Sequence, residues 1–385
     1  MKSTQQSKPK LVTVVGTRPE LIRLSRIIPA LDISFDQILV HTGQNKDKQL
    51  NEIFFEELGI RTPDFYLDVD TSSLASAIGE VFIKTEKILI ETKPNGMLVL
   101  GDTNSAFAAV LAERMQIPVY HMEAGNRSFD ANVPEELNRK IIDHASSFNL
   151  PYTQHAKRNL LAEGLDLNRI CVTGSPMREV INYYLPRIKK SEVLTELRLK
   201  ADEYFLVSAH RQENVDSPDR LHDLVNTLIA VQAKWSLPIL VSMHPRTRKQ
   251  LDNLGVNKDL PGIIFHEPFG FFDYINLQIH AKCVLSDSGT ISEESLILDF
   301  PAVTIRDSME RPEALENDGI ILAGLTTNQV IPAIEKMLDG FTKGKRKVPT
   351  DYLVEDCSAE VVRYITETIG KHHEWAGLRT VVRPK

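Results

Sequence analysis

Short apolar segments alternate with amphipathic helical segments along most of the chain, and this alternation constrains the fold more than any other feature. In the first half, apolar runs rich in β-branched residues lie at 11–15, 38–41, 97–100, 119–121, 148–151 and 170–173. Between them, residues 48–58 and 73–92 repeat their apolar side chains with the helical period. Strands alternating with helices are typical of parallel sheets that helices cover on both faces.

The same alternation starts again after a charged segment at 183–203. Apolar runs follow at 205–209, 239–243, 263–266, 283–286, 302–305 and 319–322, with helical segments at 220–233, 271–281 and 328–338. A last helical segment, 358–372, has no strand after it. The sequence therefore predicts an α/β protein of two Rossmann-like, doubly wound domains that face a cleft. We expect them at residues 10–182 and 183–357, with a C-terminal helix in 358–385 that packs back on the first domain.

Composition excludes several classes of protein. The 385 residues include 45 Lys and Arg against 52 Asp and Glu, a net charge of −7, which argues against nucleic acid as a partner. No run approaches the roughly 18–20 apolar residues of a membrane span, and charged side chains interrupt the N-terminal apolar stretch. The three cysteines, Cys171, Cys283 and Cys357, form no CxxC unit. We therefore expect a cytoplasmic protein without membrane partners or disulfides.

Polar residues follow several of the predicted strands in the first domain. The segment GTRPE at 16–20 carries Arg18, which can grip a phosphate. Asp102 follows the run at 97–100, Glu123 follows the run at 119–121, and Glu135 lies at the start of a later helix. Arg18, Asp102 and Glu135 also have structural explanations, since Arg18 can lie in a surface turn, Asp102 is a good helix N-cap and Glu135 suits a first helical turn. Glu123, directly after a strand and close to a glycine, is in an unusual position for a solvated carboxylate.

The second domain repeats this arrangement. His210 follows the run at 205–209, and the turn Ser288-Gly289-Thr290 precedes a helix in which Glu294 can bind a ribose. Alternatively, His210 is a structural histidine, and Glu294 lies on an exposed helical face. A sixth group, RDSMERPE at 306–313, follows the run at 302–305. Because ligands bind at the carboxyl ends of strands in such sheets, polar residues at six strand ends predict one functional site.

Seven motifs, in this order, then carry a resemblance: GTRPE, GDTNS, EAGNR, PEELNR, SAHRQEN, SDSGTISEE and RDSMERPE. From about residue 11 to 375 the chain resembles the non-hydrolysing UDP-N-acetylglucosamine 2-epimerases. The resemblance implies a fold of the glycosyltransferase-B type with a UDP-sugar substrate in the cleft. It also implies a homodimer that uses no metal, no nicotinamide and no other cofactor.

The resemblance also implies roles for particular residues. The acid–base groups of the family match Asp102, Glu123, Glu135 and His210. Its phosphate-contacting arginine matches Arg18, and its UDP-binding positions match Ser288, Gly289 and Glu294, with Glu294 on the ribose. Arg311 matches a basic residue near the diphosphate. Arg23, Asn126, Arg127 and Thr290 complete the expected substrate-binding set.

Two positions depart from the usual pattern of the family. Arg23 and Asn126 stand where the common enzymes carry Lys and Leu. This combination resembles the branch that interconverts UDP-2-acetamido-2,6-dideoxy-L-talose and UDP-N-acetyl-L-fucosamine for surface polysaccharides. A second, activating UDP-sugar binds many bacterial members through a Gly-Gln-His segment, which here reads TGQNKD at 42–47.

The chemistry of C2 inversion accounts for the number of acids. The C2–H bond of a UDP-N-acetylhexosamine becomes labile once the C1–O bond to UDP breaks, so elimination gives a 2-acetamidoglycal and re-addition gives the epimer. Both faces of C2 then need an acid–base group.

Four other functions are alternatives to an epimerase of the L-fucosamine branch. They are a UDP-GlcNAc/UDP-ManNAc 2-epimerase, a retaining glycosyltransferase of the same fold, a hydrolysing epimerase and a UDP-sugar sensor. Sugar transfer does not require three acids.

Overall fold

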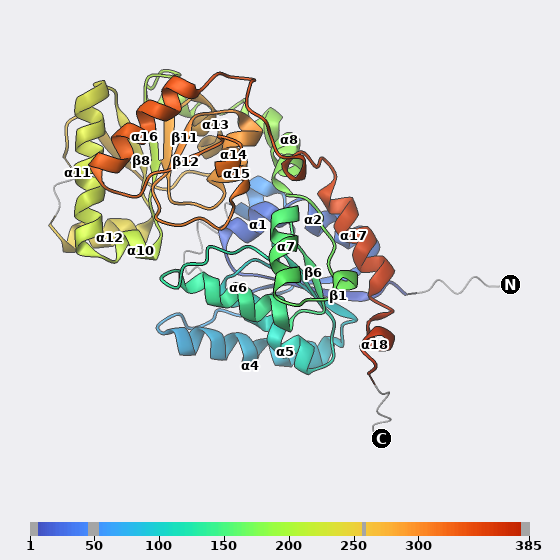
Figure 1. Ribbon diagram of the computed structural model, residues 1–385. Helices are drawn as coiled ribbons and strands as arrows, with labels where there is room; N and C mark the ends of the chain where they lie inside the picture. Colours follow the sequence, from blue (N-terminus) through green and yellow to red (C-terminus); the bar gives the residue numbers. More distant parts are fainter. Residues whose placement is uncertain (1–6, 45–53, 256–258, 379–385) are drawn as a thin grey trace. The chain divides into compact units, whose positions relative to one another are not determined.

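A computed structural model describes residues 7–44, 54–255 and 259–378, and it divides into two compact units (Figure 1). Unit 1 comprises Met1–Asn126, Pro134–Val180 and Val354–Lys385. Unit 2 comprises Arg127–Val133 and Ile181–Leu353. Each unit contains one six-stranded sheet, as the two series of apolar runs predict.

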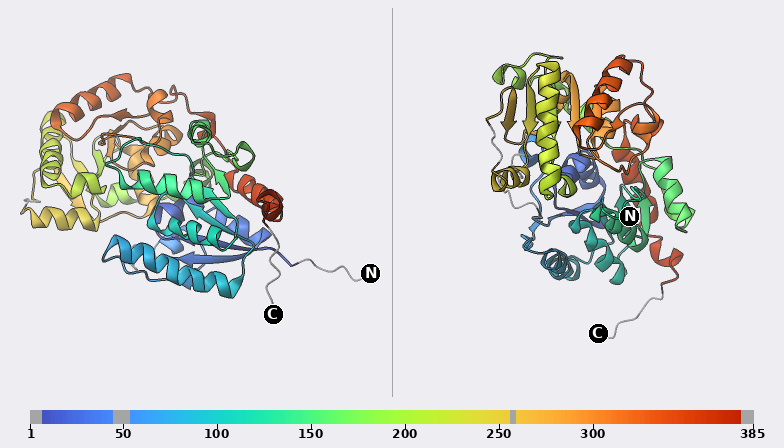
Figure 2. Two further views of the ribbon diagram at one scale, coloured as in Figure 1. Left: turned by 60° about the horizontal axis from the view of Figure 1, so that its bottom comes forward. Right: turned by 60° about the vertical axis from the view of Figure 1, so that its left-hand side comes forward.

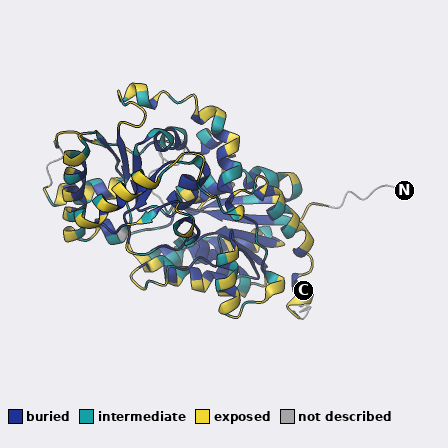
Figure 3. Cartoon of the chain, turned by 45° about the horizontal axis from the view of Figure 1, so that its top comes forward, coloured by how far each residue is buried: buried dark blue, intermediate teal, exposed yellow. Residues whose placement is uncertain are grey.

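The sheet of unit 1 is parallel and has the order β3-β2-β1-β4-β5-β6, the doubly wound order of Rossmann folds. Its central strands are buried along their whole length, because helices cover both faces (Figure 3). The strands are β1 (Lys10–Val15), β2 (Asp36–His41), β3 (Phe65–Tyr66), β4 (Gly96–Leu100), β5 (Val119–Met122) and β6 (Phe148–Leu150).

The helices of unit 1 include the C-terminal segment. Helix α17 (Cys357–Thr368) packs against α2 (Ile27–Ser34), and α4 (Leu74–Thr92) lies beside α5 (Ala108–Arg114) (Figures 1 and 2). The remaining ones are α1 (Arg18–Leu24), η1 (Asn104–Phe107), α6 (Pro134–Ala145), α7 (Gln154–Ala162), η2 (Leu167–Arg169) and α18 (His372–Trp375). Helix α8 (Met177–Ile188) carries the chain from unit 1 into unit 2.

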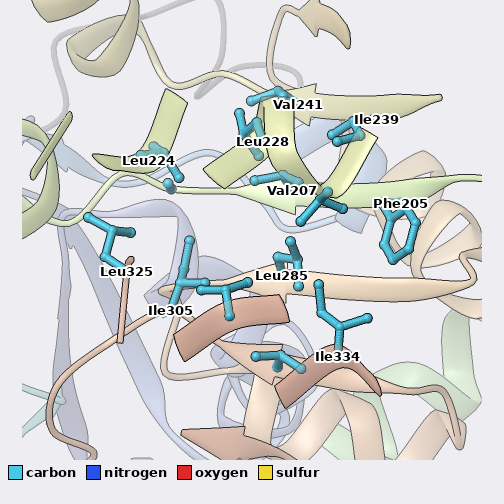
Figure 4. Packing of buried hydrophobic residues seen from close by; sticks show 14 of the residues in the cluster. Phe205, Val207, Leu224, Leu228, Ile239, Val241, Leu285, Ile305, Leu325 and Ile334 are labelled. Atoms are coloured by element: carbon cyan, nitrogen blue, oxygen red, sulfur yellow. The ribbon is translucent and has the colours of Figure 1, made fainter. Parts of the chain in front are cut away.

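The sheet of unit 2 is also parallel, with the order β12-β11-β10-β7-β8-β9. Its apolar core includes Phe205, Val207 and Leu285 from the strands and Leu224, Leu228 and Ile334 from flanking helices (Figure 4). The strands are β7 (Phe205–Ser208), β8 (Ile239–Ser242), β9 (Ile263–His266), β10 (Cys283–Ser286), β11 (Ala302–Thr304) and β12 (Ile321–Leu322).

In the described part of unit 2, nine helical segments follow α8. They are α9 (Val193–Glu196), α10 (Gln212–Val215), α11 (Pro218–Trp235), α12 (Pro245–Asn253), α13 (Phe271–His280), α14 (Ile291–Leu298), α15 (Glu313–Glu316), α16 (Thr327–Gly340) and η3 (Thr350–Tyr352). In the described ranges of both units, no helix is long and apolar enough to cross a membrane.

The structure differs from the local predictions at three points. Residues 170–173 are not a strand, since only a single bridge joins Asn149 to Ile170. The two-residue strand β3 is too short to show a period and was not predicted. The helix predicted at 358–372 is broken between α17 and α18. Of the helix predicted at 48–58, residues 54–58 are helical and 48–53 lie outside the described residues.

Candidate active site

Asp102 lies just beyond the carboxyl end of β4 and is held by α6. Arg139 approaches one carboxylate oxygen, Oδ2, with Nε at 2.8 Å and Nη2 at 2.7 Å. The side-chain amide of Asn138 donates to the backbone carbonyl of Asp102 at 2.9 Å. Both α6 residues therefore orient Asp102, and among the described residues nothing bonds to its other oxygen, Oδ1.

Glu123 occupies the matching position after β5 and has a backbone φ of +65°, a left-handed conformation that is rare for a non-glycine residue. Its Oε2 lies 3.4 Å from Nε of Arg23, and its Oε1 accepts from the amide of Asn126 at 3.4 Å. A Cβ placed on Gly101 would lie 3.9 Å from Oε2, so the Glu123 carboxylate is beside the turn that carries Asp102.

Arg23 and Asn126 are thus placed by the structure against Glu123. Arg23 is 1% exposed, and its guanidinium also lies over the ring of Tyr152, 5.4 Å from the centroid. Asn126 is 5% exposed. Two residues that the sequence analysis expected on the substrate therefore contact a predicted acid–base group directly.

Glu135 differs from the other two acids. It lies half-buried in the first turn of α6, and within the described part of the chain it has no hydrogen bond or ion pair. Its neighbour Glu136 is buried and pairs with Arg139 at 3.2 Å. The structure therefore separates the two adjacent glutamates into one structural residue and one that is available for chemistry.

The turn between β1 and α1 contains Arg18 and a carboxylate that the sequence analysis did not single out. Glu20 is buried and accepts hydrogen bonds from the Gly16 N–H at 3.1 Å and from the hydroxyls of Thr17 and Thr103 at 2.6 and 3.2 Å. Burial raises the pKa of Glu20 to about 7. The signal was present as Thr17-x-x-Glu20, the spacing of a capping box. Arg18 itself lies 5.3 Å from the centroid of the Phe54 ring.

In unit 2, His210 follows β7 and lies against Asp287, which follows β10. The buried Asp287 accepts from the backbone N–H groups of His210 and Arg211 at 2.9 Å and from the amide of Asn214 at 3.1 Å. Nδ1 of His210 is 3.3 Å from Oδ1 of Asp287, which turns the other ring nitrogen away from that carboxylate. The His210 side chain is 37% exposed, so it is accessible to a ligand.

The turn from Ser288 to Thr290 leads into α14. The hydroxyls of Ser288 and Thr290 lie 3.0 Å apart. Between them, a Cβ on Gly289 would collide with the carboxylate of Glu310. One turn along α14, the buried Glu294 accepts from the amide of Gln278 at 2.7 Å. Closely spaced hydroxyls and a side-chain-free position at the start of a helix suit a diphosphate.

Buried ion pairs surround this turn. Arg311 pairs with Glu293 at 3.3 Å, while Glu310 pairs with Arg306 at 2.8 Å and with Arg211 at 3.3 Å. Arg127, expected on the substrate, is 2% exposed and begins the segment that groups with unit 2. That segment and Arg306 border a cavity of about 300 Å³, which is lined by Asp130, Asn132, Val133, Glu213, Arg220, Arg306, Asp307 and Ser308.

The predicted residues thus form two groups. Unit 1 gathers Asp102 and Glu123 with Arg23 and Asn126, and unit 2 gathers His210 with the turn at 288–290. The sequence analysis missed the partners Arg139 and Asp287, although both lie within quoted motifs. No three His, Cys, Asp or Glu side chains of the described chain are grouped as metal ligands. Of the segment at 42–47, residues 45–47 lie outside the described residues.

Comparisons with known proteins agree with this arrangement. A family model described as UDP-N-acetylglucosamine 2-epimerase matches residues 30–366. The UDP-N-acetylglucosamine 2-epimerase of Methanocaldococcus jannaschii is 39% identical over 344 residues, which cover 86% of this chain and 92% of that protein. A UDP-2,3-diacetamido-2,3-dideoxy-D-glucuronate 2-epimerase of Pseudomonas aeruginosa is 33% identical over 334 residues, with the same coverage of 86% and 92%.

Solved structures show the same similarity. A UDP-N-acetylglucosamine 2-epimerase from Rickettsia bellii superposes with a TM-score of 0.90 at 40% identity, covering 97% of this chain and all of that one. The M. jannaschii enzyme in complex with UDP-GlcNAc and UDP gives 0.88 at 37% identity, covering 93% of this chain and 99% of that one. The prediction of two Rossmann-like domains of the glycosyltransferase-B type is confirmed.

Proposed function

The chain belongs to the UDP-N-acetylglucosamine 2-epimerase family and is an isomerase of that type, and from this premise we propose how its residues invert C2 of a UDP-N-acetylhexosamine. In the proposed reaction a base takes the C2 proton, the C1–O bond breaks with its electron pair going to the β-phosphate of UDP, and a C1=C2 double bond forms. Re-addition of UDP, with a proton delivered to the opposite face of C2, gives the epimer.

The observation that carries this proposal is the pair of carboxylates at the ends of β4 and β5. Glu123 lies beside the turn that presents Asp102, and Arg139 ties one oxygen of Asp102 while the other is left for a ligand. Glu135 supplies a third carboxylate, which forms no ion pair with any residue that the structure describes. Elimination and re-addition need proton transfer on both faces of C2, which several separately oriented carboxylates can provide.

We assign UDP to the groups of unit 2. The Ser288–Thr290 turn would hold the diphosphate, Glu294 the ribose, and His210, oriented by Asp287, would stabilise the charge on the leaving phosphate. Arg311 and Arg18 would add positive charge. The ion pair with Glu293 fixes the guanidinium of Arg311 before a ligand binds.

For the sugar, we propose a preference for UDP-2-acetamido-2,6-dideoxy-L-talose and UDP-N-acetyl-L-fucosamine. Arg23 and Asn126, the two positions that set this branch apart, both contact Glu123, so a change at either would reach the reacting carboxylate. UDP-GlcNAc is the second candidate, because the relative at 39% identity is a UDP-N-acetylglucosamine 2-epimerase.

One experiment tests reaction and substrate together. The protein is incubated in heavy water with each candidate UDP-sugar, the diacetamido-glucuronate included, and the sugars are followed by NMR. Epimerisation with deuterium incorporated at C2 is the expected result. A higher kcat/KM for UDP-GlcNAc than for UDP-N-acetyl-L-fucosamine would contradict the branch and leave the epimerase assignment intact. Transfer to an added acceptor would favour a glycosyltransferase instead.

We also propose that the chain forms a homodimer. On α4, Ile83 and Ile90 lie two turns apart and are 58% and 59% exposed. On α6, Leu137 and Ile141 are one turn apart and also exposed. Sedimentation velocity should give twice the mass of the chain. If α4 forms the interface, the double variant Ile83→Asp, Ile90→Asp should lower the measured mass to that of one chain.

A further inference from the structure

A buried chain of polar contacts joins the turn after β4 to the turn after β5. His121, in β5, is 1% exposed, and its Nε2 lies 2.8 Å from the backbone carbonyl oxygen of Gly101. Its Nδ1 lies 2.8 Å from Oδ1 of Asp143, which is 0% exposed and comes from α6. The imidazole therefore bridges the strand end before Asp102 and an aspartate on a different element.

Asp143 continues this bridge to the second turn. Its carboxylate accepts the backbone N–H of Gly125, with oxygens at 3.1 and 3.3 Å. Gly125 has a φ of +82°, and a Cβ there would collide with the carbonyl oxygen of Ala156. The bonded amide thus lies two residues beyond Glu123, whose own backbone is in the left-handed region. Such a conformation persists only where its surroundings hold it.

The direction of the hydrogen bond at each end of this bridge follows from the groups involved. A carbonyl oxygen can only accept, so Nε2 of His121 must donate to Gly101. The Gly101 carbonyl and the nitrogen of Asp102 belong to one planar peptide group. The hydrogen bond from His121 therefore fixes the orientation of the peptide plane that precedes the Cα of Asp102. At the other end, only an acceptor on Asp143 can hold the N–H of Gly125. Each end of the bridge is therefore attached to the backbone of a turn that bears a proposed acid–base residue.

We propose that His121 and Asp143 are positioning residues for the reaction, which hold the turns of Asp102 and Glu123 at a fixed separation. The inference rests on the proposed catalytic function of those two carboxylates. Neither positioning residue needs to touch the substrate. A misplacement of about 1 Å in a reacting group can cost roughly 100-fold in rate, so loss of the bridge should appear in turnover.

The test compares variants of the full-length protein that break or keep the bridge. Asp143→Leu and His121→Phe remove it at similar volume. Asp143→Asn keeps it, because the amide can donate to Nδ1 while its oxygen accepts from Gly125. We expect Asp143→Leu to lower kcat about 10- to 100-fold, with KM and UDP affinity changed by less than about 3-fold. Asp143→Asn should remain within about 3-fold of the wild type.

Tyr120→Phe is the matched control for loss of a buried hydrogen bond. Tyr120 precedes His121 in β5, is equally buried, and its hydroxyl lies 2.9 Å from that of Thr368. This variant should lose thermal stability and keep its kcat. A folded Asp143→Leu with wild-type kcat would overturn the proposal, as would an Asp143→Asn variant that is as slow as Asp143→Leu.

Two further measurements distinguish a failure of the proposed function from a failure of the positioning role. If Asp102→Asn and Glu123→Gln turn over normally, the proposed function fails; if they are slow while Asp143→Leu is not, only the positioning role fails. Should the apolar variants not fold, ¹⁵N-histidine NMR of the wild type decides. Nε2 of His121 should carry a proton that exchanges slowly with solvent, and a bare Nε2 would mean that the bridge to Gly101 does not exist.

Discussion

Nε of Arg23 lies 3.4 Å from Oε2 of Glu123, and the arginine is almost completely shielded from water. This contact joins one of the two residues on which we base the proposed substrate preference to a proposed acid–base group. Arg23 also lies over the ring of Tyr152, so its guanidinium is held from two sides. The identity of residue 23 should therefore affect catalysis through the orientation of Glu123.

Arg23→Lys tests this relationship. An ammonium is a compact point charge that can neither match the planar guanidinium over Tyr152 nor keep its position beside Glu123. We expect kcat to fall about 10-fold with UDP affinity unchanged. Steady-state kinetics and calorimetry measure the two quantities. Arg114→Lys, at an exposed position on α5, is the control. Equal kinetics for the two variants would contradict a role of Arg23 in orienting Glu123.

The three proposed acid–base residues give the second prediction. Asp102→Asn, Glu123→Gln and Glu135→Gln keep the size of each side chain and remove its ability to transfer a proton. Each should lower kcat by about 100-fold or more. UDP binding should survive, because we assign UDP to unit 2. Glu355→Gln, at an exposed position before α17, serves as the control. Any of the three that retains normal turnover is removed from the mechanism.

Glu294→Ala should act on affinity. If this buried carboxylate binds the ribose hydroxyls, its loss removes hydrogen bonds to a charged group, which are worth about 1.5–3 kcal/mol each. Isothermal titration with UDP should show weaker binding, and the effect on kcat at saturation should be small. The exposed Glu196→Ala on α9 gives the baseline. Wild-type affinity for UDP would place the ribose elsewhere.

Much of the fold could be predicted because its strands are buried on both faces. Runs such as 205–209 and 283–286 are apolar except for one serine in each, and the structure has β7 and β10 there. The edge strand β3 could not be found, since two residues that pair with Val40 and His41 carry no period. Residues 170–173 have a strand-like composition, yet they form only one bridge to β6. The apolar composition of a segment indicates that it is buried. Whether it pairs as a strand depends on the segment that lies beside it.

The candidate site was predictable for a different reason. Parallel strands bring their carboxyl ends to one edge of a sheet, so Asp102 and Glu123 were expected near each other, and they follow the adjacent strands β4 and β5. Their partners were harder to find. Arg139 is 37 residues from Asp102, and Asp143 is 22 residues from His121, so no local pattern joins them. Which side chains of a helix meet a strand end depends on how α6 packs, and a single sequence does not specify that.

Glu20 supplies the last prediction, a dependence of stability on pH. Burial raises its pKa from 4.5 to about 7 in the folded protein. The native state therefore binds a proton that the unfolded chain has released between these values. The contribution of Glu20 to stability is complete below about pH 4.5 and is lost as the pH rises through 7. Glu20→Gln, which keeps the shape of the neutral acid, should become more stable relative to the wild type by about 2–3 kcal/mol between pH 5 and 8. Urea unfolding of both proteins at several pH values measures this difference.

Tyr120→Phe is the control, because burial raises the pKa of Tyr120 far above this range. The difference in stability between Tyr120→Phe and the wild type should therefore stay constant with pH. A Glu20→Gln difference that is equally flat would show that Glu20 titrates alike in the folded and unfolded chains.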